Sequence, residues 1–498
     1  MRRNRTRPWP TALGLSAAIL ATGPLAFADE GKSGAEATAL PPSSEKLSIP
    51  YEKYTLPNGL EVILHEDHRT PFVAVSVWYH VGAFHESPGR TGFAHLFEHL
   101  MFQGSQNVGD DNHIAYLEQA GASIRKGMVN GTTNFDRTNY FEVLPKSELE
   151  LALWLESDRM GWLDISDAKL DEQRKVVKNE RLQSLENVPY GLADEKLWHA
   201  VFPEDHPYFG QIIGSLADLD AATLDDVRGF YDTYYAPSNA TLTIAGDIDV
   251  AKTKEIVEKY FGTLSPWDKP KPREVKRPSI DKPIRIDFEE PIAKLPKVTF
   301  TWLTPALFAD GDAEMDVLAH VLSSGKSSRL QRALLFDERL AQSVNAYQYS
   351  MQNVSVFGIE VVVKDGVNPE DVVSALEAQL ELLGDLPPEP AEIERAVNAI
   401  ETQRLFGLQK IGGFSGKAEQ LQSYNHFLGE PDWLANDLAR YRKITPDSLA
   451  KAIKAELDPN KRAVLVAVPK KATADAGNDD PKATETAKTD AAKNGRGS

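Results

Sequence analysis

Hydrophobic and polar residues alternate along two long stretches of the chain, and each alternation predicts a β-strand. The first stretch is FVAVSVWYHVGAF from Phe72, and the second is KVTFTWLTPALF from Lys297. A period of two is typical of strands with one buried face. Each stretch precedes a helical segment that ends at a glycine, Gly104 or Gly325, and each half closes on another strand-like run. The pattern therefore indicates two copies of one structural plan.

Strands and helices follow one another in both copies, which predicts an α+β fold of two homologous α/β-layer domains. We expect an N-terminal domain at 49–265 and a C-terminal domain at 285–470. Residues 266–284 hold five prolines and many charges, so they are predicted to link the two domains. Residues 29–48 are small and polar, as in a flexible lead-in. Residues 471–498 are almost without apolar side chains, which predicts a disordered tail.

The N-terminus has the pattern of an export signal. Arginines precede an apolar run from Trp9 to about Leu20, and a motif of small residues ends at Ala28. We therefore expect a signal peptide at residues 1–28 and a periplasmic or secreted bacterial protein. A retained membrane anchor is the alternative, but Pro24 interrupts the run before the roughly 20 apolar residues that a bilayer requires.

Charge and cysteine content argue against two further interpretations, a nucleic-acid-binding protein and a protein stabilised by disulfides. The formal net charge is −18, which argues against nucleic acid as the main partner because phosphate binding needs a basic surface. The chain has no cysteine, so an exported form cannot be held by disulfides. Its stability must then come from a buried core, with a bound metal as a further candidate.

The segment GFAHLFEHLMFQGS places His95, Glu98 and His99 in an apolar run. On a helix the three side chains project from one arc of about 100°. Two imidazoles one turn apart can bind a single metal ion, and Glu98 beside them could accept a proton from water. The order His-x-x-Glu-His is the inverted form of the zinc protease helix. The spacing alone leaves an alternative open: both histidines could be ordinary core residues whose ring nitrogens are hydrogen-bonded within the protein.

A third ligand is needed, because catalytic zinc commonly has three protein ligands and a water. The best candidate is Glu180 in DEQRKVVKNERLQSLEN. Gln173, Val176, Val177 and Glu180 recur with helical spacing, which predicts that Glu180 lies on the inward face of its helix.

Four segments of the chain resemble the pitrilysin/insulinase family of zinc peptidases, in the two-domain branch that includes mitochondrial processing peptidases and exported bacterial members. These segments are TGFAHLFEHLMFQGS, NGTTNFDRTNYFEVLP, VVKNERLQSLEN and the run from HPYFGQIIG to TIAGDID. The resemblance extends over about 50–470 in order.

The resemblance implies a zinc-dependent endopeptidase with one Zn²⁺ per chain. It implies that His95, His99 and Glu180 bind the metal and that Glu98 is the general base. It also implies that the strand Asn130, Gly131, Thr132 and Thr133 binds an extended peptide substrate by β-strand addition. The substrates would be peptides or unfolded polypeptides.

Two departures from the family pattern concern the first half of the chain. Family members often have a second acidic residue seven positions before the ligand glutamate, and this chain has Gln173 there. A residue at this position would support the metal ligands without binding the metal itself. His113 falls in a segment that we interpret as an insertion, so it is predicted to lie at the surface.

A third departure concerns the second half. Its copy of the metal helix reads Asp316, Ala319 and His320, so we expect His320 to be structural. Leu335 and Gln342 occupy the places of an arginine and a tyrosine that hold substrate in complete members. A homologous second chain is therefore the expected source of that pair. The alternative is that Arg332 or Arg339 serves instead.

Two functions other than catalysis are compatible with the fold. Some family relatives are scaffold subunits, and a peptide-binding protein is also conceivable. The presence of His95, Glu98, His99 and Glu180 together favours an enzyme.

Overall fold

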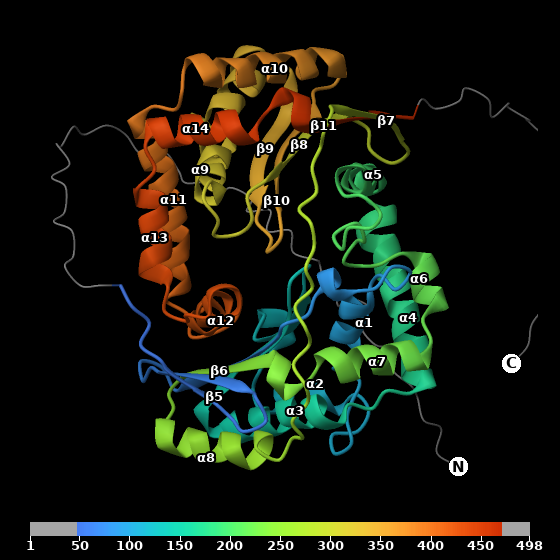
Figure 1. The fold of residues 1–498 in the computed structure, drawn as a ribbon, viewed down its shortest axis with the longest axis vertical. Coiled ribbons are helices and arrows are strands. Elements are labelled where there is room, and N and C mark those ends of the chain that lie inside the picture. Colours follow the sequence, from blue (N-terminus) through green and yellow to red (C-terminus); the bar gives the residue numbers. More distant parts are fainter. Residues whose placement is uncertain (1–46, 471–498) are drawn as a thin grey trace, which may run out of the picture.

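The computed structural model describes residues 47–470 (Figure 1). The predicted signal peptide, nearly all of the predicted lead-in and the predicted C-terminal tail lie outside the described residues. Within residues 47–470, no helix combines the length and the apolar character needed to cross a bilayer.

The N-terminal half, residues 47–265, is built around a six-stranded sheet in the order β1-β2-β6-β3-β5-β4. Its strands are β1 (Glu52–Thr55), β2 (Glu61–Glu66), β3 (Phe72–Tyr79), β4 (Val129–Thr133), β5 (Thr138–Pro145) and β6 (Ala240–Gly246). Its helices are α1 (Phe93–Leu100), α2 (Asn112–Gln119), α3 (Leu149–Trp162), α4 (Asp167–Arg181), α5 (Gly191–Val201), α6 (Leu216–Ala221), α7 (Leu224–Tyr234) and α8 (Val250–Phe261). Only β2 and β6 pair in parallel; the other neighbours are antiparallel.

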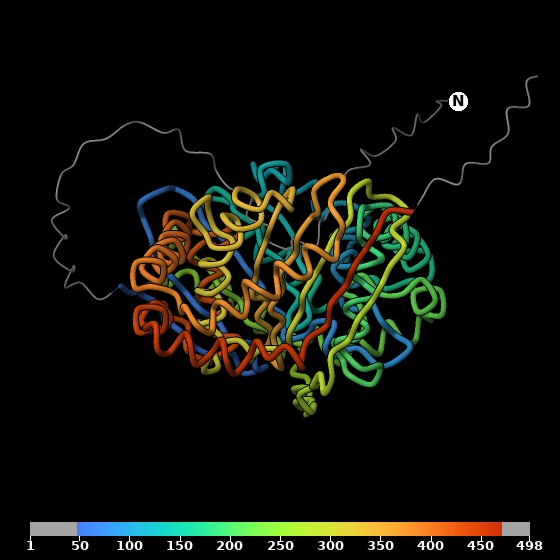
Figure 2. Tube along the Cα trace, turned by 90° about the horizontal axis from the view of Figure 1, so that it is seen from above, coloured from blue at the N-terminus to red at the C-terminus, as the bar shows by residue number. Residues whose placement is uncertain are grey.

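The C-terminal half, residues 284–470, has a five-stranded sheet in the order β7-β11-β8-β10-β9. Its strands are β7 (Ile284–Glu290), β8 (Lys297–Thr304), β9 (Ala341–Tyr349), β10 (Ser355–Val363) and β11 (Arg462–Pro469). Its helices are α9 (Asp312–Ser323), α10 (Pro369–Asp385), α11 (Pro390–Gly407), α12 (Lys417–Leu428), α13 (Leu434–Arg442) and α14 (Pro446–Glu456). Figure 2 shows the parallel pair β7 and β11 side by side.

The two sheets repeat one topology, which confirms the predicted α+β fold with two domains of the same plan. From β2 onward, the order β2-β6-β3-β5-β4 corresponds strand by strand to β7-β11-β8-β10-β9. The alternating stretches form the central strands β3 and β8. In β3 the side chains of Val73, Val75 and Val77 enter the N-terminal core, because successive strand residues point to opposite faces.

Each half contributes one helix that packs on the sheet of the other half, so the two halves exchange helices. Helix α12 packs on β3 and β6 of the N-terminal sheet, and α5 packs on β11 and β7 of the C-terminal sheet (Figure 1). Gln422 of α12 is fully buried and donates to the carbonyls of Ser76 and Thr241, at 2.9 and 2.8 Å. Residues 266–283 form no helix or strand and run from the N-terminal half to β7. Each sheet therefore has a face covered by a helix of the other half.

Candidate metal centre

Helix α1 begins at a tight contact that only glycine permits. Gly92, its N-cap, has φ 87°, and a Cβ there would lie 2.8 Å from Cα of Gly214. The Glu86 carboxylate accepts the N–H groups of Gly92 and Ala94, both at 2.9 Å, so it satisfies amides that have no partner within the helix. All eight residues of α1 are buried, and the helix packs against α4 and β4. These contacts fix the direction in which its polar side chains point.

His95 and His99 lie one turn apart on α1 with their rings close together. The ring centroids are 4.9 Å apart, and the planes are nearly perpendicular at 84°. Both residues are more than nine-tenths buried. Burial, and then the neighbouring His99, hold the pKa of His95 well below its usual range, so His95 is neutral. A neutral imidazole is the form that binds a metal.

Glu180 reaches the same point from α4. Its Oε2 lies 3.3 Å from Nε2 of His99 and 3.7 Å from Nε2 of His95. The end of α4 is held by Arg181, which pairs with Glu186 and Glu195 at 2.9 Å each. The sequence therefore positions Glu180 through a helix whose last turn is fixed by ion pairs.

One ligand atom from each of His95, His99 and Glu180 lies within 4.8 Å of the other two. In the part of the chain that the structure describes, no other three His, Asp or Glu side chains gather this closely. Nε2 of His99 is buried without a hydrogen-bond partner, although it faces the Glu180 carboxylate. Two imidazoles and one carboxylate are a common zinc donor set, so these residues fit a divalent zinc ion.

Glu98 lies beside this group and is not part of it. Its Oε2 accepts a hydrogen bond of 2.6 Å from the hydroxyl of Thr133, and burial raises its pKa. A Cβ at Gly131 would lie 3.0 Å from Cγ of Glu98, so the strand can approach this closely because residue 131 is glycine. A buried carboxyl with a raised pKa and one hydroxyl partner is suited to accept and return a proton.

The four residues predicted to bind substrate, Asn130, Gly131, Thr132 and Thr133, all belong to β4. This strand is an edge of the N-terminal sheet and pairs only with β5. An edge strand presents unpaired backbone groups on its outer side, which is the chemical basis of strand addition. The predicted segment and Glu98 are therefore neighbours through Thr133.

Two sequence predictions about burial are wrong. Val176 is 41% exposed, whereas Gln173 and Val177 of the same predicted stripe are buried. The inward face of α4 is therefore narrower than its periodicity suggested. His113 is only 2% exposed and meets the ring edge of Phe102 at 5.6 Å. Leu117, one turn further on α2, is also buried, and this spacing was the signal that could have placed His113 inside.

The residues considered for a substrate-holding pair do not form one polar cluster. Leu335 packs against the C-terminal core, and Gln342 is exposed on the edge strand β9. Arg332 is 74% exposed and lies 3.6 Å from Asp337. Arg339 has a left-handed backbone with φ 58°.

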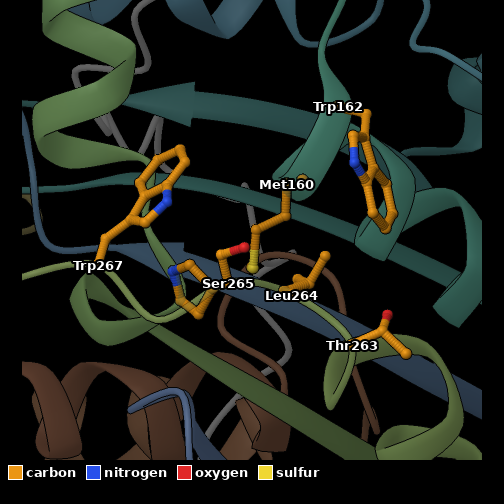
Figure 3. A pocket seen from close by; sticks show the side chains of 8 residues that line it. Met160, Trp162, Thr263, Leu264, Ser265 and Trp267 are labelled. Carbon is orange, nitrogen blue, oxygen red and sulfur yellow. The ribbon is translucent and has the colours of Figure 1, made fainter.

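A small pocket lies elsewhere in the N-terminal half (Figure 3). Trp162 at the end of α3 and Trp267 flank it, with Met160 and Leu264 between them. None of its lining residues belongs to the His95, His99 and Glu180 group or to β4. The candidate metal centre and this pocket are separate features.

Similarity to known proteins covers both halves. Residues 61–207 match the family described as Insulinase (Peptidase family M16), and residues 221–400 match the Peptidase M16 inactive domain. A Helicobacter pylori protein named zinc protease PqqE is 30% identical over 336 residues, which are 66% of this chain and 73% of that protein. A Schizosaccharomyces pombe protein named probable mitochondrial-processing peptidase subunit beta is 25% identical over 65% of this chain and 71% of its own length.

Solved structures share the fold. The crystal structure of a protease from Helicobacter pylori superposes with a TM-score of 0.78 at 24% identity, and the match covers 85% of this chain and 100% of the other. The family matches begin at β2 and extend into the C-terminal half, and the superposition covers both halves. The chain therefore belongs to the insulinase family of peptidases, family M16.

Proposed function

We propose that this chain is a zinc-dependent endopeptidase that hydrolyses peptides or unfolded polypeptides. The proposal rests above all on one observation: His95, His99 and Glu180 converge within 4.8 Å, and the buried carboxyl of Glu98 lies beside them. Relatives that carry the name zinc protease support the same reading. In this proposal His95, His99 and Glu180 hold one Zn²⁺, which when bound polarises the scissile carbonyl and lowers the pKa of water.

The remaining chemistry belongs to residues of the chain. An extended peptide pairs with β4, so that its scissile bond lies near Glu98. Glu98 takes a proton from the attacking water and delivers it to the departing amine nitrogen. Thr133 orients the Glu98 carboxylate through the 2.6 Å hydrogen bond. Gln173 is buried on the same helix as Glu180, and in this proposal it supports that ligand by packing rather than by charge.

The test is the substitution Glu98→Gln, which keeps the size of the side chain and removes its basicity. We expect peptide hydrolysis to fall by about 100-fold to 10,000-fold while zinc content stays unchanged. Hydrolysis of a peptide library and elemental analysis of the purified protein measure the two quantities. Glu118→Gln, an exposed residue of α2, is the matched control and should change neither.

A Glu98→Gln variant that kept a tenth of the hydrolysis would contradict the role of Glu98. Wild-type protein with no stoichiometric zinc would favour a scaffold subunit of the same fold. Wild-type protein that binds peptide without cutting it would favour a peptide-binding protein.

We further propose that full activity needs a second, homologous chain. The support is that Leu335 and Gln342 stand where a substrate-holding arginine and tyrosine are expected. One relative is itself named as a beta subunit. Mixing the purified chain with its homologue should raise peptide turnover. Full turnover by the single chain would contradict the proposal and would favour Arg332 or Arg339 as the substrate-holding residue.

We also propose export to the periplasm or the exterior, with cleavage near Ala28. The support is the charged and apolar pattern of residues 1–28. N-terminal sequencing of the mature protein tests it, and a mature chain that begins before Trp9 would contradict cleavage.

A further inference from the structure

The strand that contacts Glu98 has little support within its own sheet. Strand β4 has only one neighbour, β5, and its last residue, Thr133, holds the Glu98 carboxylate. An edge strand gains ladder hydrogen bonds from one side only. The position of Thr133 therefore depends on what holds the turn that follows it, residues 134–137.

That turn is closed internally by Asn134. Its side-chain oxygen accepts the N–H groups of Asp136 and Arg137, both at 2.8 Å, and its own N–H donates to the carbonyl of Arg137 at 2.9 Å. The Arg137 side chain also donates back to the carbonyl of Thr132 at 2.9 Å. A displacement of the turn is thus transmitted to the end of β4.

The C-terminal half holds the same turn through Asp136. This carboxylate is only 3% exposed. One of its oxygens accepts the backbone N–H of Gln352 at 3.0 Å, and the other accepts the hydroxyl of Tyr208 at 2.7 Å. That hydroxyl in turn accepts the N–H of Asn353 at 3.2 Å. Gln352 and Asn353 form the turn between β9 and β10, in the other half of the chain.

Apolar packing surrounds this polar contact. Phe135 stacks on Trp198 of the exchanged helix α5, with ring centroids 5.1 Å apart, and meets Tyr208 at 4.9 Å. Met351 and Val354 of the β9–β10 turn belong to the same core. Hydrogen bonds are strong in such an apolar environment, and a buried acceptor left without a donor destabilises the fold.

We propose that Asp136 is a positioning residue that couples the docking of the C-terminal half to the orientation of Glu98. The coupling runs from Gln352 to Asp136, through the turn to Thr133, and from Thr133 to the Glu98 carboxylate. Asp136 is not among the residues proposed to contact substrate or metal. The role of Glu98 as base comes from the proposed function, but the coupling between the halves and β4 does not depend on it.

A double-mutant cycle tests the coupling. Asp136→Ala removes the anchor of the turn to the C-terminal half, although Ala83 and Phe84 still donate to the carbonyls of Asn134 and Phe135. Thr133→Val removes the hydroxyl that holds Glu98 while keeping the shape of the side chain. We expect each substitution to lower kcat about tenfold with little change in KM or zinc content. Because both act on one contact, the double variant should be no slower than the slower single variant.

Hydrogen–deuterium exchange provides a readout that needs no peptidase activity. In Asp136→Ala the amides of β4 should exchange faster than in the wild type. Gln422→Ala, which also removes buried hydrogen bonds between the halves but none to β4, is the control and should leave β4 exchange unchanged. If the chain proved not to hydrolyse peptides, this exchange experiment would still decide whether Asp136 holds β4.

Multiplicative effects on kcat in the double variant, or β4 exchange unaltered by Asp136→Ala, would overturn the proposal. If Asp136→Ala does not fold, Asp136→Asn serves in its place because it retains one acceptor oxygen. The asparagine variant should then show the same direction of change in β4 exchange with a smaller fall in kcat, and wild-type behaviour in both would equally refute the coupling.

Discussion

The two halves of the molecule place the same pair of helices beside the same edge strand but fill the space with different polar groups. In the N-terminal half α1 packs against α4 and β4, and in the C-terminal half α9 packs against α11 and β9. Where α1 carries His95, Glu98 and His99, the corresponding positions of α9 are Asp316, Ala319 and His320. The scaffold is repeated, but within residues 47–470 the candidate ligand set occurs in the N-terminal copy alone.

Two acidic groups of the C-terminal copy are held by protein partners. Asp316 accepts a hydrogen bond of 2.8 Å from the Tyr441 hydroxyl. Glu401 of α11 follows Arg395 by six positions, as Glu180 of α4 follows Arg174, and is therefore the counterpart of Glu180. It pairs with Arg442 at 2.5 and 3.1 Å, which directs it toward α13. In the N-terminal copy, by contrast, two imidazoles and a carboxylate face one another, and Nε2 of His99 has no protein hydrogen-bond partner. The convergence of three candidate ligand atoms, rather than an unpaired nitrogen as such, therefore distinguishes the candidate metal centre from its structural copy.

The largest expected effect separates the two histidines at equivalent positions. His99→Ala removes one of the three proposed ligands, so stoichiometric zinc should be lost. His320→Ala removes a half-buried imidazole whose Nδ1 has no hydrogen-bond partner, so zinc content should not change. Elemental analysis of both purified variants measures the difference. An equal loss of zinc in both would show that the C-terminal half also binds metal.

The sequence predicted the parts of this site that lie within one element. The one-turn spacing of His95 and His99 and the apolar residues around them were enough to predict a buried helix with both imidazoles on one arc. Glu180 could be proposed from helical spacing, but that spacing also pointed to Val176, which is exposed. Periodicity gives the direction of a helix face and not its width.

Contacts between distant segments could not be predicted in this way. Thr133 reaches Glu98 across 35 positions, and Gln352 reaches Asp136 across 216. The exchange of α5 and α12 has the same origin, because an amphipathic pattern shows that a helix has a buried face but not which sheet covers it. That the two halves share a strand order could be expected from the sequence, because both contain a similar succession of strands and helices.

A second prediction separates the two glutamates. Glu180→Gln keeps an oxygen ligand but removes its negative charge, so zinc affinity should fall by at least about tenfold. Glu401→Gln weakens a contact with Arg442, which is 58% exposed, so the free energy of unfolding should change by less than about 1 kcal/mol. Competition with a zinc chelator and denaturant unfolding measure these quantities. Unchanged zinc affinity in Glu180→Gln would remove Glu180 from the ligand set.

Asp316, the counterpart of His95, is expected to have the smallest effect on zinc binding and to act on stability instead. Burial, and then the negative charge of Asp312, raise the pKa of Asp316 above its ordinary value. In the folded state Asp316 therefore binds a proton more readily than in the unfolded chain.

The stability that this group contributes is fully present below the ordinary Asp pKa of about 4 and is lost as pH rises through the raised value. Asp316→Asn cannot titrate, so its unfolding free energy should fall less steeply between about pH 4 and pH 8, by up to a few kcal/mol in total. Urea unfolding across this range measures the slope, and the exposed Asp365→Asn should leave it as in the wild type. A wild-type slope in Asp316→Asn would mean that this carboxyl is ionised in the folded protein, and that the C-terminal copy holds a buried charge where the N-terminal copy holds a neutral imidazole.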